Sequence, residues 1–313
     1  MSSSVVLGAG TTVAKDSEQG HRTRVFLAAL AAGCLVLALA VYGADYYSLN
    51  LAERPHSPKH ILLRPSGFVG IKLGILGAFL FFAIYLYYFR KRWKWLGRLG
   101  SSRHWLDFHV VLGLTAPVVI AFHAAFKFRS MAGIAFWIMV AVALSGVVGR
   151  YLYAQIPRSL SAAELSWQEL ESGRERLDKH LSAQKLFAPD ALRLTLQLPS
   201  PESVGRMSLP AALISMFLLD LGRPFGVARL RRRVLRVSDY FRTLWGLLPS
   251  GNRELEGAVD AVRKQSALSK KMLFLSRSQR VFHLWHVVHR PFSYTFAVLA
   301  CIHILAAVLL GYL

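Results

Sequence analysis

Five apolar segments of about twenty residues constrain the fold of this chain more than any other feature. They run approximately over residues 25–43, 68–89, 105–126, 132–153 and 281–313. An α-helix needs about this length to cross the hydrocarbon core of a bilayer. Together with a hydrophobic content of 54%, the segments predict an all-α fold, a polytopic membrane helix bundle with about five transmembrane helices.

The segments also divide the chain into four parts. Residues 1–23 form a polar N-terminal tail, residues 24–153 hold transmembrane helices 1 to 4, residues 154–279 form a basic region, and residues 280–313 hold transmembrane helix 5. The basic region contains 20 Lys or Arg against 12 Asp or Glu. We expect it to be a cytoplasmic, mostly helical insertion between helices 4 and 5.

Two helices are expected inside this insertion. Residues 162–181 have the composition of a charged surface helix, whereas residues 208–221 form an apolar run interrupted by Pro210 and Asp220. About fourteen residues are too few to span a bilayer comfortably. This run is therefore interpreted either as a buried helix of a small domain or as a helix lying along an anionic membrane surface.

We attribute the net charge of +21 to residues that orient the membrane helices. The basic residues flank the apolar segments instead of forming a nucleic-acid-binding stripe. Six basic residues and no acidic ones lie between Arg90 and Arg103, and the fourth segment ends at Arg150. If the basic ends of the second and fourth apolar segments lie in the cytoplasm, the N-terminus of the chain is inside and its C-terminus is outside. The sequence thus predicts a multi-pass integral membrane protein surrounded by lipid, typical of a bacterial inner membrane, with no nucleic-acid partner.

Histidines recur at one interval in two of the apolar segments. His109 and His123 lie fourteen residues apart in the third segment, and His289 and His303 lie fourteen apart in the fifth. Fourteen helical residues come within about 40° of four whole turns and rise about 21 Å. Because both segments are predicted to run from cytoplasm to outside, His109 should be level with His289 and His123 level with His303.

Two pairs of facing imidazoles suit two b-type haems, since a low-spin haem takes two axial ligands on opposite faces of its iron. His109, His123, His289 and His303 are therefore the predicted iron ligands. Arg103, Arg150 and Arg290 lie at the inner ends of the helices and could bind haem propionates. The positive-inside charge distribution would also account for arginines at these positions.

The inner ligand of the last segment has alternatives. His286 or His283 could replace His289, although the seventeen residues from His286 to His303 would set those two rings about 100° apart. Pro291 could mark the first turn of the helix and leave His289 at its edge. The remaining histidines in polar segments, namely His21, His56, His60 and His180, are interpreted as ordinary surface residues.

Trp285-x-x-x-His289-Arg290, followed by an apolar run to His303, and His109-x13-His123 two segments earlier resemble the haem-binding helices of the ferric-reductase-like transmembrane family. The resemblance covers the second to fifth apolar segments and implies that the four histidines are axial haem ligands. It also implies an electron-transfer subunit of an oxidoreductase. The chain departs from the family in lacking a recognisable sixth span, in its large insertion, and in having no flavin- or nicotinamide-binding segment after the last helix.

The predicted function is that of a di-haem cytochrome b passing electrons between a cytoplasmic donor and an outer acceptor, or the reverse. A flavoprotein or iron–sulfur protein could dock on the basic insertion, for example on residues 229–233. A quinone could also exchange electrons, although no sequence feature marks a quinone pocket. Two alternatives are a haem-free transporter or assembly protein whose histidines serve protons or a metal, and a membrane scaffold.

Overall fold

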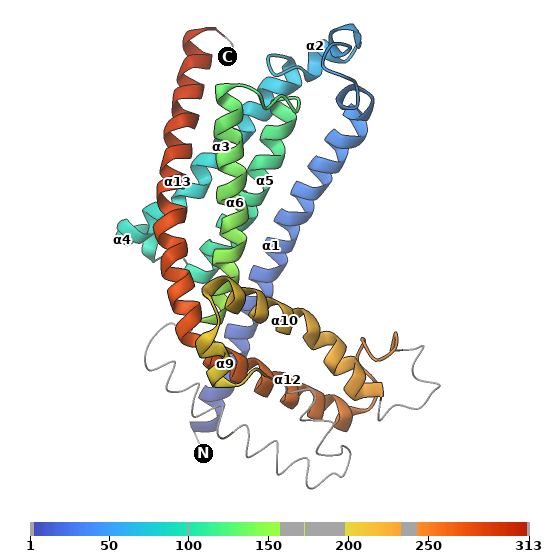
Figure 1. Cartoon of the computed structure of the whole chain (residues 1–313), viewed down its shortest axis with the longest axis vertical. Helices are drawn as coiled ribbons and strands as arrows, with labels where there is room; N and C mark the ends of the chain where they lie inside the picture. The colour runs from blue at the N-terminus through green and yellow to red at the C-terminus, as the bar shows by residue number, and fades with distance from the viewer. Residues whose placement is uncertain (1–2, 99, 157–171, 173–197, 233–242, 312–313) are drawn as a thin grey trace. The chain divides into compact units, whose positions relative to one another are not determined.

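The computed structural model describes residues 3–98, 100–156, 172, 198–232 and 243–311 (Figure 1). Every element in these ranges is helical, which confirms the predicted fold class. The elements are α1 (Ser3–Tyr47), η1 (Arg54–His56), α2 (His60–Leu63), α3 (Phe68–Arg92), α4 (Lys94–Gly97), α5 (Ser102–His123), α6 (Met131–Gln155), α9 (Pro201–Arg206), α10 (Leu209–Arg232), α12 (Arg253–Leu273) and α13 (Leu275–Leu309).

The chain divides into two compact units. Unit 1 comprises residues 1–150 and 287–313, and unit 2 comprises residues 151–286. Six helices in the described residues are long and apolar enough to cross a membrane: Gln19–Tyr47, His60–Arg90, His104–His123, Met131–Gln155, Leu209–Arg232 and Leu275–Leu309. Five of them match the predicted spans, and Leu209–Arg232 is the addition. The chain is thus consistent with a multi-pass membrane protein.

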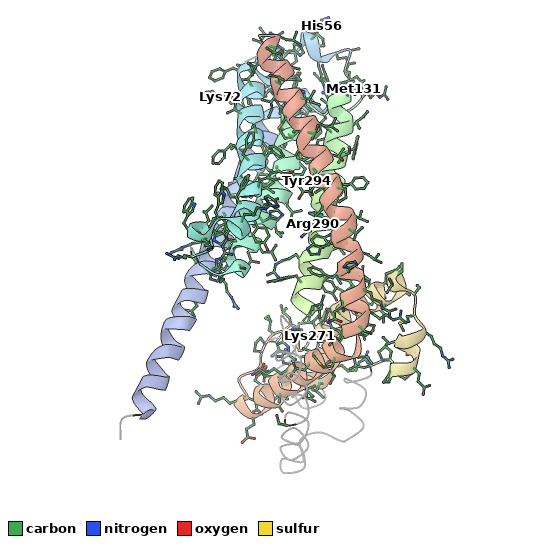
Figure 2. All side chains as sticks on the ribbon, turned by 90° about the vertical axis from the view of Figure 1, so that its left-hand side faces the viewer. His56, Lys72, Met131, Lys271, Arg290 and Tyr294 are labelled. Carbon is green, nitrogen blue, oxygen red and sulfur yellow. The ribbon has the colours of Figure 1, made fainter. Side chains whose placement is uncertain are left out.

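Helices α1 and α5 of unit 1 run in the same direction. Near the starts of their apolar spans, His21 of α1 is hydrogen-bonded to Asp107 of α5 at 3.0 Å. At the C-terminal ends of the two helices, the rings of Tyr47 and Phe122 lie 5.3 Å apart, centroid to centroid. Apolar side chains of α3, α5 and α6 form the core of unit 1, with contributions from α1 and α13 at its edge. His56, Lys72 and Met131 mark one end of this helical bundle in Figure 2.

Glycines in α3 let α5 approach closely. A Cβ at Gly77 would lie 2.1 Å from Cδ1 of Ile120, and one at Gly74 would lie 2.8 Å from Cε1 of His123. Both distances are shorter than any van der Waals contact. The absence of side chains at these two positions therefore brings α3 against the face of α5 that carries its histidines.

Arg90 fixes the connector between α3 and α5. From the sequence, this arginine is expected only to help orient the membrane helices. Arg90 is buried and donates hydrogen bonds to Oγ of Ser102 at 2.8 Å, to the Gly100 carbonyl at 2.7 Å and to the Gly97 carbonyl at 3.1 Å. A guanidinium can satisfy several acceptors at once because its donors form a rigid fork. Arg90 thus holds the start of α5 beside the end of α3.

The predicted polar tail is part of a helix. Helix α1 begins at Ser3, so the polar residues before Arg24 continue directly into the first apolar span. His21, expected to be a surface residue, is only 7% exposed, because its imidazole contacts α5. That interpretation of His21 is wrong, and the reason is tertiary packing that the local polar sequence does not reveal.

Unit 2 contains a small core built by α9, α10 and the residues just before α13. Val204, Ala212, Met216 and Phe274 are its buried members. Helix α10 is longer than the predicted apolar run, because it continues through Asp220 and Pro224 to Arg232. The Asp220 carboxylate receives bonds from the Lys270 ammonium and, at 2.7 Å, from the Tyr151 hydroxyl, so an acid within α10 is satisfied without breaking the helix.

The arginine cluster predicted to dock a partner is only partly at the surface. Arg231 is buried and forms a two-pronged ion pair with Glu256, through Nε at 2.9 Å and Nη2 at 2.5 Å. Burial alone would raise the pKa of Glu256, but bonds from Arg231 and Ser250 outweigh it and hold that pKa below its ordinary value. Arg231 is therefore a structural residue. The surface helix predicted over residues 162–181 lies outside the described residues, except for position 172.

Candidate functional site

The inner histidines of the two predicted pairs meet at one cavity of unit 1. His109 on α5 and His289 on α13 both line a cavity of about 180 Å³. Gly113 and Gly146 line it as well, and a Cβ added to Gly113 would enter open space. Figure 2 shows Arg290 and Tyr294, two further lining residues, on successive turns of α13.

Hydrogen bonds hold both inner imidazoles by their Nδ1 atoms. Nδ1 of His109 lies 3.2 Å from the Ile84 carbonyl. Nδ1 of His289 lies 2.7 Å from Oγ of Ser145, and that hydroxyl donates its own proton to the Val142 carbonyl at 2.8 Å. A carbonyl only accepts, and Ser145 has already used its proton, so each Nδ1 must be the donor.

This arrangement fixes the tautomer of the two neutral imidazoles. With the proton on Nδ1, the lone pair able to bind a metal lies on Nε2. Metal-ligating histidines characteristically donate their other N–H to a carbonyl, carboxylate or hydroxyl, which orients the ring and raises its basicity. The inner pair thus has the hydrogen bonding of a metal-ligand pair.

The outer histidines also come together. The rings of His123 on α5 and His303 on α13 have centroids 6.5 Å apart and planes inclined at 69°. Nδ1 of His123 donates to the Gly70 carbonyl at 2.8 Å, so its Nε2 has the same role as that of His109. His109 and His289 line one cavity and the rings of His123 and His303 are neighbours, so α5 and α13 run parallel within unit 1, as the sequence predicts.

The separation of the outer rings suits an iron atom between them. Two metal–imidazole bonds of about 2.0 Å and two ring radii place ring centroids about 6 Å apart, close to the observed distance. In the neutral state, two imidazoles at this spacing gain only a weak edge contact. The spacing of the outer ring centroids is therefore compatible with bis-histidine ligation.

Helix α13 is continuous around His289, which removes the concern raised by Pro291. The helix begins at Leu275 and contains Pro291 in its interior. Ser293 Oγ donates to the His289 carbonyl at 2.7 Å, and the Tyr85 hydroxyl donates to the Ser293 carbonyl at 2.9 Å, tying α13 to α3. His289 thus lies on a complete and anchored helical turn.

His286 has different surroundings from His289. It belongs to unit 2, where its ring lies 4.5 Å from the ring of Phe282 and 4.7 Å from that of Trp285, centroid to centroid. Its Nδ1 lies 3.2 Å from the carbonyl of Phe282 in the same helix. Of the two candidates, His289 is the one that lines the cavity with His109.

The three predicted propionate partners are placed differently. The exposed Arg290 lines the cavity of the inner pair. Arg150 donates to Oδ1 of Asp107 through Nη2 at 2.6 Å and through Nε at 3.0 Å, so its guanidinium already has an anionic partner. Arg103 lies in the first turn of α5, but its side chain is outside the described part of the chain.

A polar cluster beside the inner pair was missed by the sequence analysis. Asp107 accepts from Arg150 and lies 3.0 Å from Nε2 of His21, whose ring stacks on that of His104 with centroids 3.6 Å apart. One signal was available, because a carboxylate within an apolar helix is costly and usually marks a partner or a function. The α1 partner could not be found without the fold.

The fit of the inner site to a cofactor is uneven. Its donors fit haem, but the cavity of about 180 Å³ is below the roughly 300–1,000 Å³ of typical ligand pockets, so neighbouring side chains must move for a macrocycle to enter. Among the described residues, no group of three or more His, Cys, Asp or Glu could hold a metal ion. A bis-histidine haem needs only two protein ligands, so that finding concerns other kinds of metal site.

Comparisons with protein-family models, with curated proteins and with solved structures found no match for this chain. The geometry of the two histidine pairs therefore carries the functional argument alone.

The contact between Gly74 and His123 gives a prediction for the outer pair. In Gly74→Ala, the new Cβ would lie 2.8 Å from the His123 ring, so the ring must move, which disturbs its hydrogen bond to the Gly70 carbonyl. With haem as the predicted ligand of this pair, we expect the purified variant to lose most of it, measured as the haem-to-protein ratio. Gly33→Ala on α1 is the matched control, since a Cβ at Gly33 meets nothing within 4 Å; equal haem contents in both variants would contradict the prediction.

Proposed function

We propose that this protein is a di-haem b-type membrane cytochrome that carries electrons across the bilayer as a subunit of a redox complex. The observation that supports it best is the shared hydrogen bonding of His109, His123 and His289. Each donates Nδ1–H to a backbone carbonyl or to Ser145, which leaves the Nε2 lone pair able to bind a metal. Three of the four predicted ligands thus share the tautomer that metal-ligating histidines use.

The four histidines would bind the iron atoms of two haems, one pair for each. A haem with both axial positions filled by imidazole changes oxidation state by one electron with little rearrangement. The chain contributes rigid ligand positions, since His109 and His123 are on one helix and are separated by about 21 Å of rise. Arg290 supplies a cation beside the inner pair.

The orientation proposed is a cytoplasmic N-terminus and an outer C-terminus, in a bacterial inner membrane. This places the inner pair near the cytoplasm and the outer pair near the opposite surface. The donor or acceptor on the cytoplasmic side would be a flavoprotein or an iron–sulfur protein. Arg229 and Arg232 of α10 are exposed, and replacing both by Ser should weaken the salt dependence of reduction by that partner.

The experiment that tests the proposal is spectroscopic. The chain, expressed in haem-replete cells and purified in detergent, should give a dithionite-reduced b-type spectrum and two non-covalent haems per chain by the pyridine haemochrome assay. A colourless preparation with an intact helical circular-dichroism spectrum would overturn the proposal. It would favour a haem-free transporter or assembly protein whose histidines serve protons or a metal.

A further inference from the structure

One side of α10 in unit 2 is apolar and exposed. Five large apolar side chains of this helix are each 55–60% exposed, namely Ile214, Phe217, Leu218, Leu221 and Phe225. At about 100° per residue they fall within an arc of about 100°, so they form one stripe along the helix. The opposite side of α10 is covered, because Ala212 and Met216 belong to the small core of unit 2.

The loop over residues 243–250 adds four exposed apolar side chains, which are Leu244, Trp245, Leu247 and Leu248. It is fixed to the end of α10, because Nη1 of the buried Arg231 donates to the carbonyls of Gly246 and Leu247 at 3.0 and 3.2 Å. Leu244 and Trp245 have φ angles of 44° and 56°. This left-handed conformation is uncommon for residues with a side chain, and here it belongs to a turn whose apolar side chains face outward.

The loop continues the stripe of α10. A Cβ at Gly246 would lie 2.8 Å from the carbonyl oxygen of Ala228, so the loop lies directly against that residue. Ala228 follows Ile214 by fourteen positions, which places it within about 40° of the same angle around α10. The stripe and the loop therefore form one surface, called here the apolar face of unit 2. An exposed apolar patch of this kind usually marks an interaction site.

An arginine stands at the end of the stripe. Arg232 follows Ile214 by eighteen positions, or about five whole turns, and is exposed on the line of the stripe. Arg229 is exposed at its edge, about 60° away, where a soluble partner can also reach it. A long arginine side chain can lie along apolar surface and hold its guanidinium against an anion such as a lipid phosphate.

Both ends of unit 2 lie in candidate membrane spans. Its boundaries, residues 151 and 286, fall within Met131–Gln155 and Leu275–Leu309, two of the helices that are long and apolar enough to cross a bilayer. A lipid surface is therefore held close to unit 2 by the chain itself. Such tethering gives that surface a high effective concentration, so that modest contacts suffice for binding.

Helix α10 is itself long and apolar enough to cross a bilayer, but its packing opposes that placement. Helix α12 packs against it within unit 2 and has exposed charged residues, among them Asp260 and Lys264, which form an ion pair at 2.7 Å. Ionised side chains are costly in the hydrocarbon core. With α10 at the membrane surface instead, the charges of α12 stay in water.

We propose that the apolar face of unit 2 binds the surface of a bilayer that contains anionic phospholipids. Trp245 and the stripe of α10 enter the boundary between headgroups and acyl chains, and Arg232 pairs with lipid phosphates. Under this proposal, the two interpretations of residues 208–221 describe opposite sides of one helix. The inference concerns unit 2 alone and does not depend on haem binding.

Spin labelling of the full-length chain in nanodiscs of phosphatidylcholine and phosphatidylglycerol measures the depth of this face. The two cysteines, Cys34 and Cys301, are exposed and are replaced by Ser. Single labels at Phe217→Cys and Leu247→Cys report on the apolar face, and a label at Lys264→Cys on α12 is the matched control. Relaxation by oxygen, which is enriched in lipid, is compared with relaxation by a water-soluble nickel chelate.

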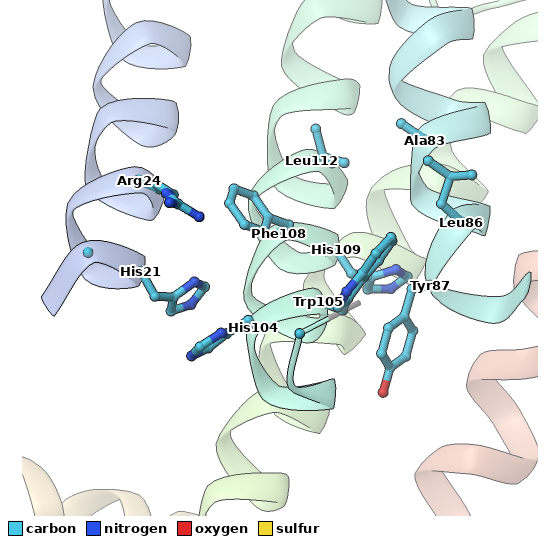
Figure 3. Close-up of a pocket in the computed structure, with 12 residues that line it drawn as sticks. His21, Arg24, Ala83, Leu86, Tyr87, His104, Trp105, Phe108, His109 and Leu112 are labelled. Atoms are coloured by element: carbon cyan, nitrogen blue, oxygen red, sulfur yellow. The ribbon is translucent and has the colours of Figure 1, made fainter. Parts of the chain in front are cut away.

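Unit 1 supplies two reference depths. Cys34, when it is the single cysteine retained, lies near the middle of the span Gln19–Tyr47 and reports on the hydrocarbon core. A label at Arg24→Cys reports on the edge of that span. Figure 3 shows Arg24 one turn beyond His21, where the polar rings of His21 and His104 stack between α1 and α5.

We expect the oxygen-to-nickel relaxation ratio at Phe217→Cys and Leu247→Cys to be about tenfold higher than at Lys264→Cys, as immersion by about 5–10 Å requires. Both labels should lie near the depth of Arg24→Cys and above that of Cys34. Omitting phosphatidylglycerol, or adding Arg232→Ser, should lower the ratio at Leu247→Cys at least about twofold. Arg263→Ser, which removes an exposed arginine of α12, should leave that ratio unchanged.

Four results would overturn the inference. Equal ratios at the two face positions and at Lys264→Cys would place the face in water. Immobilised labels that neither reagent reaches would show that protein covers it. A label at Phe217→Cys as deep as Cys34 would make α10 a transmembrane helix, and ratios unaffected by phosphatidylglycerol and by Arg232→Ser would exclude recognition of anionic lipid. Every labelled position in unit 2 is exposed, and helical circular dichroism equal to that of the unlabelled chain checks the fold.

Discussion

Under the proposed function, replacing His289 by Leu should lower the haem content of the purified chain from two per chain to one, whereas replacing His286 by Leu should leave both. His289 lines the cavity of His109 and is oriented by Ser145 at 2.7 Å. His286 instead packs against Phe282 and Trp285. Loss of one of two axial ligands leaves a weakly held macrocycle that detergent extraction removes.

Two double variants separate ligation from general damage. His109→Leu combined with His289→Leu should retain one haem, because both residues serve the same centre, whereas His289→Leu combined with His303→Leu should retain none. The measurement is haem per chain, with helical circular dichroism as the check on folding. Retention of both haems by His289→Leu, or loss of one by His286→Leu, would assign the inner ligand to His286.

Asp220→Leu should destabilise unit 2 by about 3–5 kcal/mol, because it leaves a buried ammonium without its carboxylate. Lys270 is 1% exposed and donates to Asp220, which also bonds the Tyr151 hydroxyl. Burial lowers the pKa of Lys270, and the Asp220 carboxylate opposes that shift. The free energy of unfolding, measured with denaturant in a mild detergent, should show the loss.

Two comparisons identify the mechanism of that loss. Asp260→Leu removes an exposed ion pair with Lys264 and should cost about 0–1 kcal/mol, while Asp220→Leu with Lys270→Leu should recover most of the stability. The pKa of Lys270 falls further without Asp220, so the penalty should shrink as the pH rises toward the ordinary lysine pKa of about 10.4. A pH-independent loss, equal in the single and double variants, would point to packing instead.

Long-range periodicity allowed much of unit 1 to be predicted. The third and fourth spans, expected over residues 105–126 and 132–153, correspond to Ser102–His123 and Met131–Gln155. The parallel direction of α5 and α13 followed from counting basic ends, and the structure brings His123 to His303 accordingly. The limits of a helical span follow from the length of an apolar run, and the level of a residue along the helix follows from its spacing in the chain. Both can be counted in the sequence.

Partners between distant helices could not be predicted in the same way. His21 and Asp107 are separated by 86 positions, and nothing in the polar N-terminal sequence indicates that α1 extends unbroken to meet α5. The extent of α10 was also underestimated, because Asp220 reads as a helix interruption until its contacts with Lys270 and Tyr151 are known. The ligand-orienting role of Ser145 likewise requires three-dimensional proximity.

The order of the helices along the chain has a consequence for biogenesis. Helix α5 carries two of the histidines and is synthesised early, while the other two, His289 and His303 of α13, follow the whole of unit 2. A ribosome-bound chain that has inserted only α1 to α6 therefore offers each haem a single imidazole. Under the proposed function, stable cofactor capture must be a late event, and unit 2 would begin to fold before either centre is complete.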